Sequence, residues 1–305
     1  MFKAFFSIGA LAITTIAVAQ PPRLPASFHS RMIAVPGAEL FVQSGGSASP
    51  VVLLHGYVQT GDMWGPLAAA LARRHTVIVP DLRGLGRSSR PADGYDKKTQ
   101  ARDIRAVIEA LGFDQAVIVG HDLGGMVAYA YAAQYPSKVT RLVVMEASPP
   151  GIAPWNEIVK IPSVWHFNFG GPVAERLVDG RERIYFERFW NEFSGDSSRI
   201  DGATRDHYAA QYAAPGAMRA GFAQFAAFGR DAADNAVFAR TKLTMPVLAI
   251  GGERADRAFS TVTATAMREV ATNVSAAIVP GAGHWLIEEN PDATVRLVNS
   301  FIEGK

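Results

Sequence analysis

Residues 120–124 read Gly-His-Asp-Leu-Gly and place one acidic side chain, Asp122, between two glycines. The arrangement Gly-x-nucleophile-x-Gly makes a sharp turn from a strand into a helix and exposes its central side chain, which is a serine in many enzymes. The N-terminus of the following helix favours negative charge, so a carboxylate at this position stays ionised. The motif therefore predicts that Asp122 is a carboxylate nucleophile.

A His-Gly-Tyr motif at residues 55–57 follows the apolar run 51–54. Loops that follow parallel strands meet at the carboxyl edge of a sheet, where open α/β sheets bind their ligands. The backbone N–H groups of Tyr57 and Leu123 can then point at one developing oxyanion. We expect these two amides to form an oxyanion hole beside the nucleophile.

His284 is the candidate for proton transfer. It lies in a Gly-Ala-Gly-His-Trp segment that follows the last apolar run of the chain. The order nucleophile, acid, histidine along the chain is one of the known orders of a catalytic triad. Two acids are placed to orient this histidine: Glu146, after the run 142–145, and Asp256, in the loop after the run 247–250. Spacing alone does not decide between them.

The elements that must position these residues alternate between short apolar runs and helical stretches. The expected strands are 40–43, 51–54, 76–79, 116–119, 142–145, 247–250 and 276–279. The expected helices are roughly 62–73, 97–111, 124–134, 261–271 and 292–302. This alternation is typical of the α/β class, with a mostly parallel central sheet flanked by helices.

Residues 149–241 break this alternation, because the segment is rich in aromatic residues and lacks buried-strand runs. We expect an inserted helical cap domain over 149–241, lying across the carboxyl ends of the strands. The core is then formed by residues 20–148 and 242–305. An aromatic cap predicts a dry, apolar substrate pocket.

The first residues combine Lys3, an apolar stretch over 4–18 and the small residues Ala17 and Ala19. This pattern is typical of a secretory signal peptide, and the apolar stretch is short for a membrane span of about 20 residues. We expect cleavage after Ala19, a secreted or periplasmic protein, and no stable membrane insertion.

The composition excludes several classes of site. The chain has no cysteine, which excludes thiol catalysis, cysteine-ligated zinc and iron–sulfur clusters. With 30 basic and 28 acidic residues the formal net charge is +2, and no basic cluster is interleaved with aromatics, so nucleic acid is not an expected partner. His121 and Asp122 lack further ligands at metal-binding spacing, and we expect neither a metal nor a cofactor.

Together these segments resemble the epoxide hydrolase branch of the α/β-hydrolase family, and within it the secreted bacterial members. The resemblance covers nearly all of the chain after residue 19, and its most specific segments are 55–60, 81–88, 121–122, 145–147, 164–167, 239–242 and 283–286. It implies that Asp122 is the nucleophile and His284 the general base. It further implies that Glu146, rather than Asp256, is the charge-relay acid, and that His166 in the cap donates a hydrogen bond to the opening epoxide ring. The implied substrates are a small apolar epoxide and water, and a homodimer is compatible with the resemblance.

One departure from the family pattern concerns a second ring-opening donor, a tyrosine from a later cap helix. Phe225 occupies that position and has no hydroxyl to donate. Either His166 works alone, or Tyr208 or Tyr212 reaches in from a neighbouring turn, or the chemistry differs.

Two other functions stay open on these residues. A dehalogenase attacks a carbon–halogen bond with the same carboxylate, but Leu123 stands where haloalkane dehalogenases carry a tryptophan. Phe167 and Phe225 likewise occupy halide-binding positions of the fluoroacetate type. A secreted binding module with weak catalysis is the second alternative, and the missing tyrosine is the feature that favours it.

Overall fold

The computed structural model describes residues 21–255 and 261–305 of the chain. The expected signal peptide, residues 1–19, and the acid candidate Asp256 lie outside these ranges. Among the described residues, no helix is both long and apolar enough to cross a bilayer.

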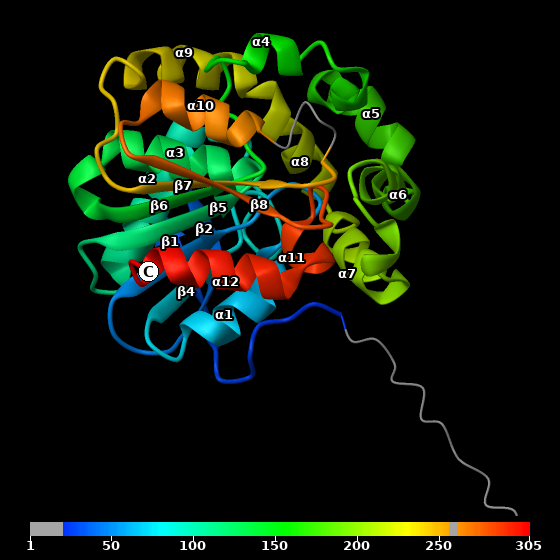
Figure 1. Cartoon of the computed structure of the whole chain (residues 1–305). Helices are drawn as coiled ribbons and strands as arrows, with labels where there is room; N and C mark the ends of the chain where they lie inside the picture. Colours follow the sequence, from blue (N-terminus) through cyan, green and yellow to red (C-terminus); the bar gives the residue numbers. More distant parts are fainter. Residues whose placement is uncertain (1–20, 256–260) are drawn as a thin grey trace, which may run out of the picture.

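An eight-stranded sheet forms the centre of the molecule (Figure 1). Its strands are β1 His29–Val35, β2 Ala38–Gly45, β3 Pro50–Leu54, β4 Thr76–Pro80, β5 Ala116–His121, β6 Val139–Met145, β7 Val247–Gly252 and β8 Val274–Val279. They lie in the order β1-β2-β4-β3-β5-β6-β7-β8, antiparallel from β1 to β4 and parallel from there to β8. The predicted α/β fold with a mostly parallel sheet is confirmed, and each predicted strand lies within an observed one.

The edge strand β1 is an element that the sequence pattern did not predict. It pairs with β2 at the edge of the sheet, and its first four residues are exposed. An antiparallel edge strand can keep one face in solvent, so it carries no continuous apolar run.

Helices cover both faces of the sheet, which is why the central strands are apolar throughout. The core helices are α1 Gly65–Leu71, α2 Lys97–Ala110, α3 Leu123–Gln134, α10 Val262–Val270, α11 Leu286–Glu289 and α12 Pro291–Ile302. α1 packs beside α12 on one face, and α2 packs beside α3 on the other (Figure 1). Every residue of β3 and β5 is buried between these layers. The adjacent carboxyl ends of β3, β5 and β6 are therefore held rigidly at one edge.

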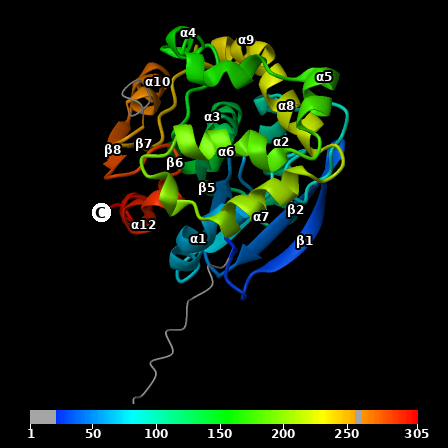
Figure 2. The same cartoon turned by 90° about the vertical axis from the view of Figure 1, so that its right-hand side faces the viewer.

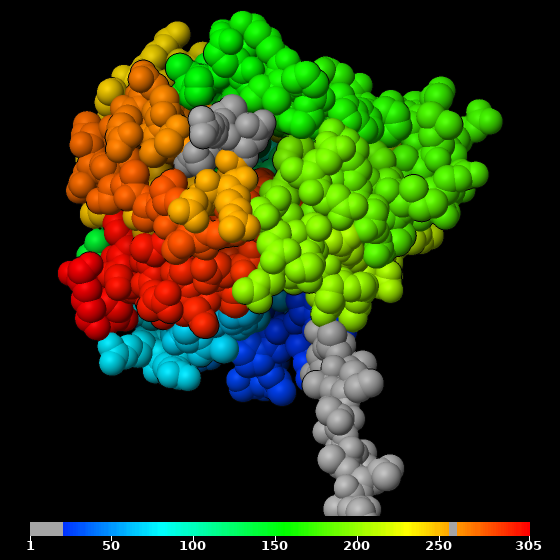
Figure 3. Space-filling view, turned by 45° about the vertical axis from the view of Figure 1, so that its right-hand side comes forward, coloured from blue at the N-terminus to red at the C-terminus, as the bar shows by residue number. Residues whose placement is uncertain are grey.

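The chain between β6 and β7 forms the cap. Its helices are α4 Trp155–Ile158, α5 Gly171–Val178, α6 Glu182–Glu192, α7 Gly202–Tyr212, α8 Ala217–Ala226 and α9 Phe228–Phe238, and a 3-10 segment, η3, spans Pro162–Asn168. Figure 2 shows these helices gathered at one end of the sheet, and Figure 3 shows the green cap lying against the red C-terminal part of the core.

Buried polar contacts join the cap to the core. Lys97 Nζ in α2 lies 3.3 Å from Asp231 Oδ2 in α9, and both side chains are almost completely buried. Beside them, Gln100 Nε2 donates to Gln224 Oε1 at 2.8 Å. Buried charges are costly unless they are paired, so these contacts favour one docking position of α8 and α9 on the core.

Candidate active site

Asp122 lies on the sharp turn between β5 and α3. Its backbone has φ 51° and ψ −123°, a conformation that L residues rarely adopt. The turn requires glycine nearby, because a Cβ on Gly120 would collide with the carbonyl of Gly124, and a Cβ on Gly56 would collide with the Asp122 side chain. The sequence pattern at 120–124 thus corresponds to a turn that presents a carboxylate.

The expected oxyanion-hole amides lie beside this carboxylate. Tyr57 N donates to Asp122 Oδ1 at 2.7 Å. Leu123 is the first residue of α3, so its N–H has no acceptor within the helix. Val58, the next residue after Tyr57, has φ 66°, and its N–H donates to the Tyr212 hydroxyl at 2.9 Å. A cap tyrosine therefore supports the loop that carries the Tyr57 amide.

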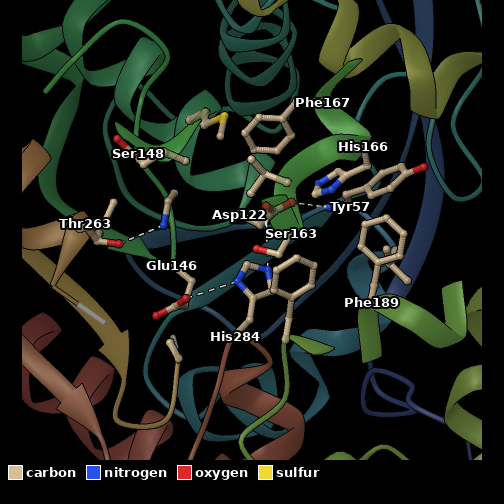
Figure 4. Close-up of a pocket in the computed structure, with 18 of the residues that line it drawn as sticks. Tyr57, Asp122, Glu146, Ser148, Ser163, His166, Phe167, Phe189, Thr263 and His284 are labelled. Atoms are coloured by element: carbon tan, nitrogen blue, oxygen red, sulfur yellow. Dashed lines mark hydrogen bonds and ion pairs between the residues drawn. The ribbon is translucent and has the colours of Figure 1, made fainter. Parts of the chain in front are cut away.

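His284 lies between two carboxylates, as Figure 4 shows. Its Nδ1 is 3.3 Å from Glu146 Oε2, and its Nε2 is 3.9 Å from Asp122 Oδ2. The other oxygen of Glu146 accepts from Gly252 N at 2.7 Å. Glu146 is buried and has φ 46°, so the turn after β6 is strained in the same sense as the turn at Asp122. The structure thus brings Glu146, one of the two acids that the sequence left open, into contact with the histidine.

The loop that carries His284 is held by its own set of hydrogen bonds. Glu289 Oε1 accepts from Gly283 N at 2.9 Å and from Trp285 N at 3.2 Å, on either side of the histidine. His121 Nε2 approaches the His284 carbonyl oxygen at 2.8 Å. His121, the residue before Asp122, therefore supports the loop that carries His284, consistent with a structural role.

Burial and neighbouring groups shift the pKa values of His284 and His121 in opposite directions. Burial lowers the pKa of His284, but the contact with Glu146 and the negative charge of Asp122 outweigh it, so that pKa is raised. Burial lowers the pKa of His121 well below its usual value, and the proximity of His284 adds to the effect. Of these two rings, His284 therefore gains a proton more readily, as a general base requires.

His166 lies in η3, in the cap wall across from Asp122 (Figure 4). The side chain is buried among the rings of Phe167, Phe189 and Phe225, with centroid distances of 4.8, 4.8 and 5.1 Å. Burial, with the charge of Arg188, lowers the pKa of His166 to about 3. At neutral pH this ring is uncharged and carries one N–H that can donate.

The structure also locates the two tyrosines proposed as substitutes for Phe225. The Tyr208 hydroxyl donates to Glu288 Oε1 at 3.0 Å, and the Tyr212 hydroxyl oxygen accepts from Val58 N at 2.9 Å. Neither lines the cavity next to Asp122, whereas Phe225 does. Of the three alternatives that the sequence left open, the one in which Tyr208 or Tyr212 reaches the cavity finds no support in this geometry.

A cavity of about 240 Å³ joins these residues. Its walls are mainly apolar and include Trp155, Ile158, Val164 and Phe193. The charged side chains in the wall, apart from histidine, are three carboxylates, Asp122, Glu146 and Glu192, and no lysine or arginine of the described residues lines it. The cavity therefore favours an uncharged, apolar molecule over an anion. Within 21–255 and 261–305, no three His, Cys, Asp or Glu side chains are grouped to hold a metal ion.

Two residues near the reacting groups were missed by the sequence analysis. Ser163 lines the cavity three positions before His166, on the other side of the kink at Val164 in η3. Thr263 Oγ1 accepts from Ala147 N at 3.0 Å and so supports the turn after Glu146. The i, i+3 spacing of serine and histidine was visible in the sequence, but the cap offered no pattern that predicted a 3-10 helix there.

Comparison with known proteins agrees with this geometry. Residues 49–291 match the family model described as alpha/beta hydrolase fold. The chain is 34% identical over 281 residues to a soluble epoxide hydrolase of Corynebacterium sp. (strain C12), covering 90% of this chain and 96% of that protein. It is 27% identical over 292 residues to a fluoroacetate dehalogenase of Burkholderia sp., covering 90% and 94% respectively.

A solved structure, that of the Cif epoxide hydrolase from Acinetobacter nosocomialis, superimposes with a TM-score of 0.84 at 24% identity, covering 91% of this chain and 90% of that one. At that identity the likeness shows the fold alone. The family match and the Corynebacterium relative carry the assignment further. The chain belongs to the α/β-hydrolase family, and it is a hydrolase.

Proposed function

We propose that this protein is an epoxide hydrolase that opens its substrate through a covalent ester on Asp122. The observation that carries the proposal is the neutral His166 in the cap wall, facing the carboxylate across an apolar cavity. A nucleophile on one side and an uncharged hydrogen-bond donor on the other suit a strained ring that must lose a carbon–oxygen bond. The soluble epoxide hydrolase of Corynebacterium supports the same choice.

In the first half-reaction Asp122 Oδ2 attacks one epoxide carbon. A carbon–oxygen bond to the carboxylate forms, the ring carbon–oxygen bond breaks, and the electron pair passes to the ring oxygen. His166 donates a hydrogen bond to this developing alkoxide, which takes up one proton from solvent. The product is a hydroxyalkyl ester of Asp122.

In the second half-reaction His284 removes a proton from water, whose oxygen attacks the ester carbonyl carbon. Tyr57 N, which binds Asp122 Oδ1 in the resting state, and Leu123 N hold the oxyanion. The tetrahedral intermediate expels the diol oxygen, which takes the proton back from His284. Asp122 then loses one proton to solvent, so the two half-reactions together add one water to the epoxide.

Dehalogenation is the nearest alternative, since the Burkholderia relative carries that name. A haloacid needs a cation for its carboxylate, but the described residues that line the cavity supply none. A halide also needs several donors, whereas Phe167 and Phe225 present only ring carbons next to His166. These features favour the epoxide.

The test traps the intermediate. His284→Gln is expected to stall the second half-reaction, so incubation with styrene oxide should add the mass of the whole epoxide to the protein, as measured by intact-mass spectrometry. The adduct should vanish when Asp122→Ala is added. An adduct from chloroacetate alone, lighter by the departed chloride, would overturn the proposal in favour of a dehalogenase. No adduct from either reagent on folded protein would favour a binding module.

We also propose that the mature protein begins at Gln20 and is secreted or periplasmic. The charged, apolar and small-residue segments of residues 1–19 support this proposal. Expression of the full chain in a bacterium, followed by intact-mass measurement of the periplasmic and medium fractions, tests it. A protein that keeps residues 1–19 and stays in the cytoplasm would contradict it.

A further inference from the structure

The described residues of the cap wall offer no tyrosine hydroxyl that could act beside His166 as a second donor to the oxygen of the epoxide. Phe225 has none to offer, and the Tyr208 and Tyr212 hydroxyls are bound elsewhere. The ring of Tyr57 lines the cavity, but its hydroxyl is enclosed and points away from Asp122 (Figure 4).

The remaining donors of the cavity wall are few. The Ser148 hydroxyl and Trp285 Nε1 are closed off by surrounding atoms. Thr263 lies on the core side, at the turn that it supports. Ser163 differs from these residues because it is half-buried on the cap side and lines the cavity. Within the described part of the chain its hydroxyl has no hydrogen-bond partner, although its carbonyl oxygen accepts from Arg188 Nη2 at 3.0 Å.

Ser163 and His166 are carried by one short segment, η3, on either side of a kink at Val164 (φ −93°, ψ 21°). Both residues lie within η3 and both line the cavity. His166 Nδ1 is enclosed in the cap, which leaves Nε2 as the ring nitrogen that can reach the cavity. Figure 4 shows Ser163 and His166 together with Asp122 and His284 among the residues that line the cavity.

We propose that Ser163 is the second ring-opening donor, so that its Oγ–H and the Nε2–H of His166 both bind the oxygen of the epoxide. The inference rests on the proposed function and deepens it. As the bond from Asp122 to carbon forms and the ring carbon–oxygen bond breaks, the electron pair on oxygen is stabilised by these two hydrogen bonds. The oxygen then takes up the solvent proton of the first half-reaction, and Ser163 keeps its own.

The local chain explains why a serine can replace a tyrosine here. A tyrosine reaches the cavity from a later helix, whereas Ser163 is carried by the segment that carries His166. The backbone of Ser163 is held through its carbonyl by Arg188, and the guanidinium of Arg188 packs 5.0 Å from the Trp165 ring centre. A short side chain on a held backbone loses little freedom when it donates.

The experiment measures ester formation and ester decay separately. In the His284→Gln background, the rate at which styrene oxide adds its mass to Asp122 reports the first half-reaction. Ser163→Ala is expected to slow this rate by about 10- to 100-fold, the range expected for loss of one donor to a developing oxyanion. In the otherwise native protein, the same change should leave the decay of the ester at its original rate.

Ser148→Ala serves as the comparison, because it also removes a hydroxyl from the cavity wall but one that is enclosed. We expect its effect on ester formation to be much smaller than that of Ser163→Ala. Circular dichroism and thermal unfolding of each variant establish that it is folded.

Four outcomes overturn the inference. Ester formation in Ser163→Ala that equals the parent shows that the hydroxyl is not used. Equal slowing of formation and decay, or equal slowing in Ser148→Ala, shows a general disturbance of the cavity. Absence of any adduct in the His284→Gln parent refutes the proposed function itself, and the assignment of Ser163 falls with it.

Discussion

Replacing Glu146 with glutamine is expected to slow the hydrolysis of the Asp122 ester while leaving its formation nearly unchanged. Glu146 Oε2 contacts His284 Nδ1 at 3.3 Å, and Oε1 accepts from Gly252 N at 2.7 Å. A glutamine can keep the bond to Gly252 with its carbonyl oxygen, which turns its amide N–H₂ toward the histidine. Its amide then donates to Nδ1 and favours the tautomer that carries the proton on Nε2, which cannot accept one from water.

The magnitude follows from two contributions. Loss of a hydrogen bond to a charged partner costs about 1.5–3 kcal/mol, or roughly 10- to 150-fold in rate. The wrong tautomer adds to this, since the equivalent change in a serine-based triad lowers kcat by about 10⁴. We therefore expect ester decay to slow by about 10²- to 10⁴-fold.

The assay is a single turnover with enzyme in excess of styrene oxide, quenched over time and analysed by intact mass. Ester formation and ester decay appear as the rise and fall of one adduct. Asp256→Asn is the matched control, because Asp256 is the acid that the sequence analysis could not exclude. Slow decay in Asp256→Asn with normal decay in Glu146→Gln would refute the assignment of Glu146, as would slowing confined to ester formation.

Three further predictions follow from the same geometry. Ester formation converts the Asp122 carboxylate to a neutral ester and removes one of the charges that raise the pKa of His284. The pH at which ester decay falls to half its maximum on the acid side should therefore lie below the His284 pKa measured by NMR in the free enzyme. A midpoint at or above that pKa contradicts the argument. Because the pKa of His166 is about 3, the rate of ester formation should show no His166 titration between roughly pH 5 and 9. A pH dependence of that rate, measured by stopped flow, that disappears in His166→Gln would contradict this prediction. A single turnover in ¹⁸O-water should label Asp122 rather than the diol, and peptide mass spectrometry that finds the label in the diol would exclude attack at the ester carbonyl.

The local pattern of the chain was sufficient to predict the fold and the sharp turn that presents the Asp122 carboxylate. Continuous apolar runs such as 51–54 and 116–119 can be satisfied only between two covered faces, and the Gly-x-Asp-x-Gly motif permits a turn that few other sequences tolerate. These are short-range constraints, acting over fewer than about ten residues. They predicted the parallel sheet, the position of Asp122 and the approach of Tyr57 N.

Contacts between segments that are distant in the chain could not be predicted from this local pattern. Glu146 and His284 are 138 positions apart, and spacing alone allowed Asp256 as the partner equally well. The packing of β6 beside β7 and the strained turn at Glu146 bring that carboxylate to the histidine. Likewise, the directions of Tyr208, Tyr212 and Ser163 depend on how the cap docks, since a side chain's position in the sequence does not specify which surface its helix presents to the core. The sequence by itself predicted which side chains could take part in the reaction. The packing of the cap on the sheet determined which of these side chains face the cavity.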